Sequence, residues 1–217
     1  MRMNAELFIS EIKLKKFEEI YRRDFVENYI EVWKDKPWNE AVKCASCGKN
    51  FGREYEKTNN CPECRGALKP YWSKNKVDKD IDKALNQKDC EIILAMNKEK
   101  VIGFSYGYKF DEPKSGIELI ESGPQFEQWK KVVKISYIEG LGVLKQFKGR
   151  GIGRKLLETI TRCFEDKNYD MIVLGTLPVN GPAMNLYKSL GFEETDIEDP
   201  KWSGSRYMKK KLNRQNS

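Results

Sequence analysis

Apolar residues at the start of the chain follow strand spacing and then helical spacing. The segment 7–12 is apolar enough for a strand, and aromatic and aliphatic residues recur every three or four positions from Leu14 to Trp33. The helical pattern stops near Pro37, and residues 44–71 are rich in cysteine, glycine and asparagine but poor in aliphatic side chains. This pattern predicts a strand, a long amphipathic helix and a small insert.

After the insert, the pattern predicts a helix and then a hairpin. Val77, Ile81 and Leu85 return to helical spacing. Two strands are expected at 90–96 and 101–110, because each is an apolar run and a polar turn separates them.

Residues 111–131 contain two prolines and two glycines, so we expect a loop with one helical turn at 126–129. A substrate gate and a plain surface excursion are equal alternatives for this loop. A strand at 132–144 leads through a glycine turn into an amphipathic helix. The predicted inward face of that helix is formed by Ile152, Leu156, Ile160 and Phe164. A strand at 171–174, a helix at 182–190 and closing strands complete the pattern.

A chain of 217 residues can hold one domain of about 150 residues and a small appendage. We therefore predict one α/β domain built from 1–37 and 75–217, with an inserted unit at 38–74. No apolar run approaches the ~20 residues of a membrane helix, and nothing resembles a signal peptide. We expect a soluble, cytoplasmic protein with no membrane partner.

Composition narrows the chemistry that the chain can perform. Forty basic residues against 33 acidic ones give a net charge of +7, a mild excess that favours acidic ligands. Histidine is absent, so proton transfer must use Glu, Asp, Tyr, Cys or water. Any metal site must use cysteine or carboxylate.

Residues 146–153 combine three glycines and two basic side chains with the start of a predicted helix. Glycine lets the backbone approach a ligand, and the unpaired N–H groups at a helix N-terminus favour an anion such as a pyrophosphate. The glycine spacing differs from a Rossmann motif, and the lysine and hydroxyl residue of a nucleotide P-loop are absent. Alone, this loop is weak evidence, because any tight turn before a helix can contain such glycines.

Two motifs together resemble the GNAT acetyltransferase superfamily. The first is the family's pyrophosphate loop after an aliphatic strand end, here Leu141-Gly142-Val143 and Gln146-x-x-Gly149-x-Gly151. The second is an asparagine followed at set offsets by three short signatures, here Asn180, Ala183, Leu186-Tyr187 and Leu190-Gly191-Phe192. The resemblance covers nearly everything outside the insert. It implies an α/β (α+β) GNAT fold with a mixed central sheet that is splayed at the acetyl-CoA site.

The resemblance also implies how acetyl-CoA binds. The backbone of Leu141 and Val143, on either side of Gly142, would pair with the pantetheine arm, and Asn180 would contact the cofactor farther along. The implied pyrophosphate-binding residues are Gln146, Phe147, Lys148, Gly149, Arg150, Gly151, Ile152 and Gly153.

Direct transfer to an amine needs a proton donor and a proton acceptor. By resemblance Tyr187 protonates the departing thiolate; the ordinary alternative is a core tyrosine on an amphipathic helix. An ammonium with a pKa near 10.4 must lose a proton before it attacks, and Glu139 is the candidate base. A strand carboxylate that faces solvent is its equal alternative. Cys90 and Cys163 are expected to pack as small apolar residues, not to act as nucleophiles.

Four cysteines form two Cys-x-x-Cys knuckles with 13 residues between them, which is close to the spacing of a four-cysteine zinc ribbon. They are Cys44, Cys47, Cys61 and Cys64. A disulfide pair or a redox site is less favoured. Four thiolates leave no open coordination position, so the predicted zinc is structural. Basic and aromatic residues on the ribbon also allow nucleic acid binding, which we favour less than a structural or protein-docking role.

The sequence therefore predicts an acyl-CoA-dependent N-acetyltransferase that moves acetyl from acetyl-CoA to a primary amine of a small molecule or protein. The passage Pro37-Trp38-Asn39-Glu40 resembles proteins related to aminoglycoside acetyltransferases and favours a small amine, whereas the zinc ribbon favours a protein. These two indications cancel. The alternative is a non-catalytic CoA sensor or scaffold whose ribbon binds nucleic acid or a partner protein.

Overall fold

The fold is organised around a mixed β-sheet of seven strands. The computed structural model describes residues 12–110, 134–198 and 204–212. The strand order is β1-β5-β6-β7-β8-β10-β9. The strands are β1 (Ile12–Lys16), β5 (Glu91–Asn97), β6 (Lys100–Lys109), β7 (Ile135–Val143), β8 (Met171–Thr176), β9 (Glu193–Glu198) and β10 (Arg206–Lys211). Because β7 and β8 are parallel and β10 is antiparallel to β8 and β9, the mixed sheet predicted from the sequence is confirmed.

The helices follow the apolar spacing of the sequence. In the described ranges the α-helices are α2 (Arg22–Val32), α3 (Lys74–Leu85), α5 (Ile152–Asp166) and α6 (Gly181–Ser189), and the short 3-10 helices are η1 (Glu19–Tyr21), η2 (Arg53–Tyr55) and η4 (Lys145–Phe147). In α5 the four predicted inward side chains are all 2% exposed or less, as the 3.6-residue period requires. None of the helices in the described ranges has the length and apolar character that a membrane crossing requires.

Packing divides the chain into two compact units. The first comprises Met1–Lys83, Leu94–Phe104 and Gly142–Ile152, and the second comprises Ala84–Ile93, Ser105–Leu141 and Gly153–Ser217. Each unit has its own buried core.

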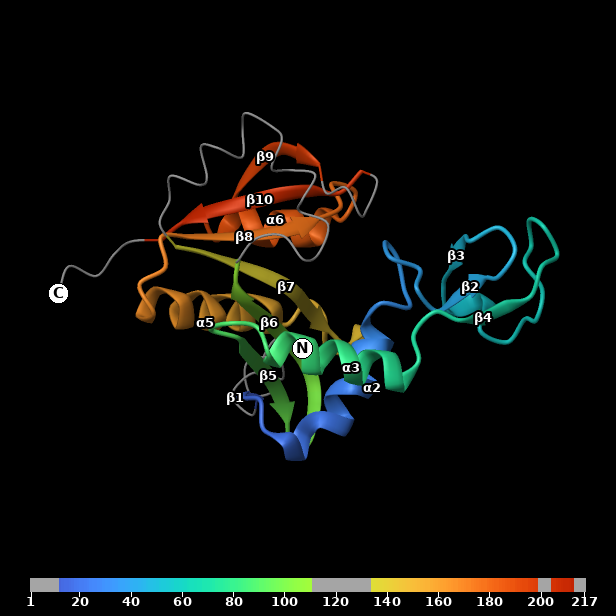
Figure 1. Ribbon diagram of the computed structural model, residues 1–217, viewed down its shortest axis with the longest axis horizontal. Helices are drawn as coiled ribbons and strands as arrows, with labels where there is room; N and C mark the ends of the chain where they lie inside the picture. The colour runs from blue at the N-terminus through green and yellow to red at the C-terminus, as the bar shows by residue number, and fades with distance from the viewer. Residues whose placement is uncertain (1–11, 111–133, 199–203, 213–217) are drawn as a thin grey trace, which may run out of the picture. The chain divides into compact units, whose positions relative to one another are not determined.

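In the first unit, α2 packs its aromatic face on the fully buried Phe104. The ring of Phe25 lies 5.1 Å from that of Phe104, and the ring of Tyr29 is stacked on it at 5.5 Å. Arg22 of α2 pairs with Asp78 and Asp82 of α3 and so joins the two helices, whose ribbons are labelled in Figure 1. These contacts fix the position of both helices that flank the insert.

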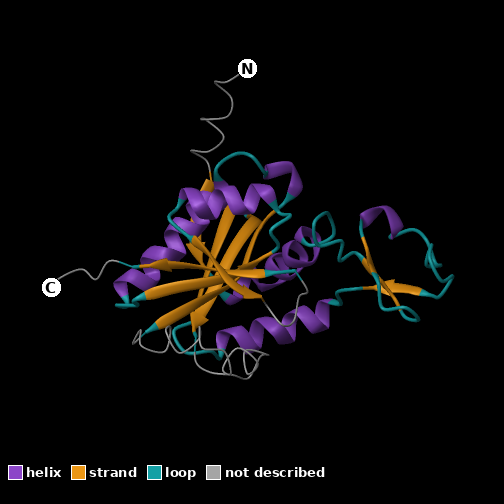
Figure 2. Ribbon diagram, turned by 90° about the horizontal axis from the view of Figure 1, so that it is seen from above, coloured by secondary structure: helices purple, strands orange, loops and turns teal. Residues whose placement is uncertain are grey.

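The insert forms a separate three-stranded antiparallel sheet in the order β3-β2-β4. Its strands are β2 (Val42–Cys44), β3 (Asn50–Phe51) and β4 (Leu68–Pro70). Loops and turns make up most of the insert, as the long teal segments around the three short strands show in Figure 2. A unit with so little regular structure needs another source of stability, such as a metal.

The parallel strands β7 and β8 are paired over only the first part of β7. Their parallel register runs from Ile135 opposite Met171 to Ile138 opposite Leu174, although β7 continues to Val143. β8 continues as well and stays paired with β10 up to Thr176. The central sheet is therefore splayed from Glu139 onward, which confirms the predicted form of the fold.

One boundary predicted from the sequence is wrong. Leu14 belongs to β1, not to the long helix, and α2 begins only at Arg22. Pairing within the sheet outweighs the helical spacing here, because an edge strand gains backbone hydrogen bonds that spacing alone does not reveal. The predicted strand residues 7–11 and the loop at 111–131 lie outside the described residues.

Candidate functional site

The turn between β7 and α5 has the conformation of an anion-binding loop. After η4, Lys148 is extended, and Gly149 and Gly151 adopt φ angles of +74° and +75°. These angles cost other residues about 1–2 kcal/mol, so both positions require glycine. A turn of this kind presents backbone N–H groups to an anion, together with the first N–H groups of α5, which begins at Ile152.

The loop is open and carries positive charge. Gln146, Lys148 and both left-handed glycines are exposed, and a Cβ placed on either glycine meets no described atom within 4 Å. The guanidinium of Arg150 lies 5.9 Å from the ring centre of the half-buried Phe147. Lys145, at the start of η4, pairs with Asp35 at 3.5 Å. The predicted pyrophosphate residues 146–151 thus form the turn between the middle of η4 and the start of α5, and Ile152 and Gly153 are the first two residues of α5.

At the end of β7, just before this loop, Gly142 allows the strand to pack closely against neighbouring side chains. A Cβ on Gly142 would lie 2.7 Å from Val32 Cγ1 and 2.8 Å from Phe104 Cζ, so only glycine fits between these side chains. Leu141 is half-buried and Val143 is buried, and the N–H of Leu144 donates to the carbonyl of Ile102. The three predicted pantetheine-binding positions therefore lie on a tightly fixed strand.

In the second unit, α6 carries Asn180 and Tyr187. Asn180 precedes the first turn as the N-cap, and its side chain makes no capping hydrogen bond. Tyr187 is 8% exposed and packs against Phe192 at 6.0 Å between ring centres. Burial raises the pKa of the Tyr187 phenol to about 12, so this hydroxyl stays protonated at neutral pH.

Glu139 is exposed on β7, and its Oε2 accepts a hydrogen bond of 2.6 Å from the hydroxyl of Tyr108 on β6. The sequence did not single out Tyr108. The alternation of Tyr106 and Tyr108 along a predicted strand places their side chains on one face of the sheet. Which residue of the next strand lies beside Tyr108 depends on the sheet register, which the sequence pattern does not give. The structure thus gives Glu139 a hydroxyl partner that can hold its orientation.

The four predicted cysteine ligands come together. Their Sγ atoms all lie within 4.8 Å of one another, with 3.4 Å between Cys44 and Cys64 and 3.8 Å between Cys47 and Cys61. Four sulfurs at about 2.3 Å from a tetrahedral zinc ion would be about 3.8 Å apart, so the cluster fits that metal. None of the four is in a disulfide. The N–H groups of Cys47 and Ser46 point to the Cys44 sulfur and lower its pKa to about 6, which favours the thiolate that a metal binds.

Ion pairs connect the insert to the end of α2. Arg53 on η2 pairs with Glu31 at 2.5 Å and with Asp35 at 3.3 Å, and Lys34 pairs with Glu56 at 2.7 Å. Burial acts to raise the pKa values of Glu31 and Asp35, but the neighbouring basic side chains lower them further. Both carboxylates therefore stay charged. Asp35 thereby contacts both the insert and Lys145 at the cofactor loop.

Glu40 is a buried carboxylate that sequence reasoning did not identify as a site residue. It is 4% exposed, and its Oε2 accepts a hydrogen bond of 3.0 Å from Trp72 Nε1. Burial raises the pKa of Glu40 to about 7, although Trp72, Lys76 and Tyr71 act in the opposite direction. A carboxylate this perturbed is a candidate for function.

The raised pKa of Glu40 predicts how stability depends on pH. Between its ordinary value of 4.5 and about 7, the folded protein holds a proton that the unfolded chain has lost. The free energy of unfolding should therefore fall as pH rises through this range, by ~3 kcal/mol. Glu40→Gln should remove this part of the pH dependence. Urea unfolding of both proteins at pH 5 and pH 8 measures it; an equal pH dependence in the two proteins would contradict the assignment.

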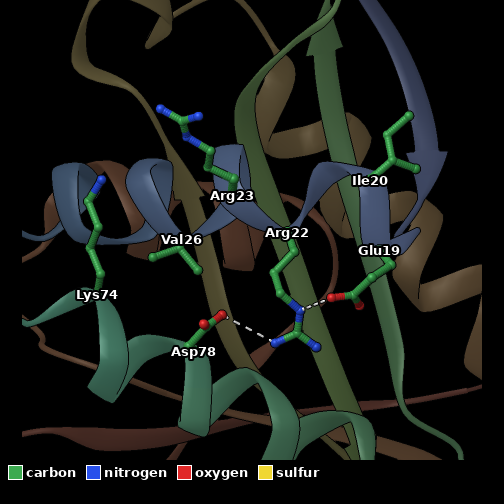
Figure 3. A pocket seen from close by; sticks show the side chains of 7 residues that line it. All are labelled: Glu19, Ile20, Arg22, Arg23, Val26, Lys74 and Asp78. Carbon is green, nitrogen blue, oxygen red and sulfur yellow. Dashed lines mark hydrogen bonds and ion pairs between the residues drawn. The ribbon is translucent and has the colours of Figure 1, made fainter.

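A hollow of about 330 Å³ between α2 and α3 carries none of the predicted site residues. It is lined by Glu19, Ile20, Arg22, Arg23, Val26, Lys74 and Asp78. Figure 3 shows the Arg22 guanidinium bound to Glu19 and Asp78, so its charge is already paired.

Cys90 is unsuited to act as a nucleophile, because burial raises the pKa of its thiol to about 11.

Comparison with known proteins identifies relatives of this chain. Residues 53–192 match the model of the acetyltransferase (GNAT) family. The chain is 33% identical over 72 residues to an N-alpha-acetyltransferase of Sulfurisphaera tokodaii, covering 33% of this chain and 43% of that protein. It is 32% identical over 71 residues to a thialysine N-epsilon-acetyltransferase of Mus musculus, covering 33% and 41%. The matched segments thus span about two fifths of the length of these relatives.

Solved structures show the same fold. The yncA acetyltransferase of Salmonella typhimurium, solved with its cofactor acetyl-CoA, aligns with a TM-score of 0.58. The alignment covers 95% of this chain and 97% of that one at 14% sequence identity. At this identity the likeness concerns the fold alone.

Proposed function

Because the chain belongs to the GNAT acetyltransferase family, we propose that it transfers the acetyl group of acetyl-CoA to a primary amine of a small molecule or protein. The observation that carries the proposal is the loop after β7, where two left-handed glycines precede the N-terminus of α5. Such a loop is suited to a pyrophosphate.

We assign the cofactor contacts by motif position. The N–H groups from Phe147 to Gly153 hold the pyrophosphate, with Gln146, Lys148 and Arg150 at its rim. The backbone of Leu141, Gly142 and Val143 pairs with the pantetheine arm, and Asn180 contacts the cofactor farther along. The splay after Ile138 supports this assignment, since it leaves strand backbone without its β8 partner.

The reaction is a direct transfer between two bound substrates. The substrate ammonium first gives a proton to Glu139, which releases it to solvent. The neutral amine nitrogen then attacks the thioester carbonyl carbon, and the bond from that carbon to sulfur breaks. The attacking nitrogen gives its second proton to Glu139, which again releases it to solvent, and the departing thiolate takes a proton from Tyr187, which regains one from solvent. Holding amine and thioester together lowers the entropic part of the barrier. The high pKa of Tyr187 supports its role as donor, because the phenol is protonated whenever a thiolate forms.

We also propose that the insert, residues 38–74, is a zinc ribbon held by Cys44, Cys47, Cys61 and Cys64. The tetrahedral fit of the four sulfurs supports zinc, and the closed ligand set supports a structural role. The metal would supply folding energy to the insert and take no part in acetyl transfer.

The test is CoA-thiol release from acetyl-CoA with polyamines, aminoglycosides, lysine peptides and N-terminal peptides as acceptors. Tyr187→Phe should lower kcat roughly a hundredfold and leave the KM for acetyl-CoA nearly unchanged, because only a proton donor is lost. Tyr207→Phe is the matched control, since it also removes a phenol hydroxyl from a buried tyrosine of the second unit. Tight acetyl-CoA binding without turnover on any acceptor would refute the enzyme and favour a CoA sensor.

A further inference from the structure

Half-buried aromatic side chains surround Glu40 in the first unit. The Trp72 ring lies 5.0 Å from Tyr71 and 5.4 Å from Tyr29, and Trp33 lies 5.8 Å from Tyr29 and 5.6 Å from Trp38, all measured between ring centres. The backbone N–H of Glu40 donates to the backbone carbonyl of Trp33, and its carboxylate accepts a hydrogen bond from Trp72 Nε1, so Glu40 is held beside these residues. We call Glu40 and the five rings, Tyr29, Trp33, Trp38, Tyr71 and Trp72, the Glu40 cluster. Each ring is partly buried and partly exposed to solvent.

The Glu40 cluster is continuous with the strand that carries the proposed pantetheine site. Tyr29 is stacked on Phe104 at 5.5 Å, and Trp33 meets the same ring at 6.2 Å. Phe104 in turn packs so closely on Gly142 that a Cβ there would lie 2.8 Å from its ring. Phe104 therefore links the cluster to the part of β7 that we assign to the pantetheine arm.

The cluster has the chemistry of an ammonium site. The buried Glu40 carboxylate provides negative charge above about pH 7, where it is ionised, and the faces of tryptophan and tyrosine attract cations. One cation already uses these faces, because the Lys76 ammonium lies 4.4 Å from the Trp72 ring centre and 5.5 Å from that of Tyr71. Lys76 itself is an exposed residue of α3. A ligand ammonium can therefore replace the lysine without opening the core.

We propose that the Glu40 cluster recognises the acceptor substrate, and that this substrate is an amine carrying a second, unreacted ammonium group. Glu40 pairs with that second ammonium, Trp72 and Tyr71 cover it, and Lys76 occupies its place in the free protein. This inference rests on the proposed acetyl transfer and defines the acceptor class of that reaction.

The test compares acceptors that differ by one ammonium group. Acetylation of α,ω-diamines of three to six carbons is measured beside the monoamines of equal length. A peptide with lysine next to its free N-terminus is measured beside the same peptide with norleucine, which separates a peptide source from a free diamine. We expect kcat/KM to be at least tenfold higher for a dicationic acceptor than for its monocationic partner.

Substitutions in the Glu40 cluster test whether the preference for dicationic acceptors arises there. Glu40→Gln should abolish it, chiefly through KM for the dication, whereas Glu54→Gln, which removes the same charge from an exposed position of the insert, should keep it. Lys76→Gln should have the opposite effect and lower KM for the dication, because it vacates the Trp72 face. A purely structural Glu40 would not predict that opposite effect. An unchanged preference in Glu40→Gln, or no preference in the wild type, would overturn the inference.

Equilibrium binding separates this inference from the proposed function. Calorimetric titration of the same diamines into the protein saturated with CoA requires no turnover. Binding that weakens at least tenfold in Glu40→Gln, in a protein that acetylates nothing, would support the site and refute the enzyme. Acetylation of monoamines and dications at equal rates, with no diamine binding, would refute the site and leave the enzyme standing.

Discussion

Cys61→Ser should lose the zinc ion that we propose and unfold the insert. Cys61 is 2% exposed and Cys44 is 1% exposed, so these two ligands form the inner side of the cluster. Zinc binding to four such ligands is worth about 10–16 kcal/mol in small zinc-binding peptides, and the insert has only eight residues in its three short strands to replace it. Metal content per chain, measured by mass spectrometry after gel filtration, should fall from about one zinc to near zero.

The two remaining cysteines provide the matched controls for this experiment. Cys90→Ser and Cys163→Ser remove the same sulfur from half-buried positions outside the cluster, and both should retain the full metal content. Loss of the insert also removes the ion pairs of Arg53 and Lys34, so the unfolding temperature of Cys61→Ser should fall. A Cys61→Ser protein with full zinc content and unchanged unfolding would show that the four sulfurs are not the ligands.

Gly151→Val should weaken acetyl-CoA binding roughly a thousandfold. A β-branched residue is strongly disfavoured at φ +75°, so the loop must change its backbone angles. The N–H groups that the proposal assigns to the pyrophosphate then turn away, and each hydrogen bond to a charged group is worth about 1.5–3 kcal/mol. Two such bonds account for the expected loss. Isothermal titration with CoA measures the change in Kd directly.

Gly204→Ala separates backbone strain from loss of the binding loop. Gly204 also has a left-handed backbone, with φ +81°, but belongs to neither motif. Its variant should cost stability and leave the affinity for CoA within about twofold of wild type. Equal Kd values for Gly151→Val and the wild type would exclude the loop as the pyrophosphate site.

Several features could be predicted because they are encoded within short stretches of sequence. The face of α5 follows from four apolar residues at helical spacing, and all four are buried. The two left-handed glycines of the cofactor loop follow from a motif of six residues, and the cysteine cluster follows from two knuckles. In each case neighbours in the chain determine the geometry, so the sequence pattern is sufficient.

Other features depend on residues that meet only after folding. Tyr108 meets Glu139 across 31 positions because β6 and β7 set their register. Trp72 meets Glu40 across 32 positions because the pairing of β2 with β4 brings the two ends of the insert together. The predicted start of the first helix was wrong for the same reason, because Leu14 pairs in the sheet as part of β1.

The sequence by itself determined the family motifs, the helix faces and the four-cysteine cluster of this protein, because local spacing and local backbone conformation control them. Only the tertiary structure decided that Glu40 is buried. The passage around Glu40 did not reveal its burial, and its pKa of about 7 arises when surrounding side chains exclude water from it. Burial is a property of the packed chain, and the proposed acceptor site depends on it.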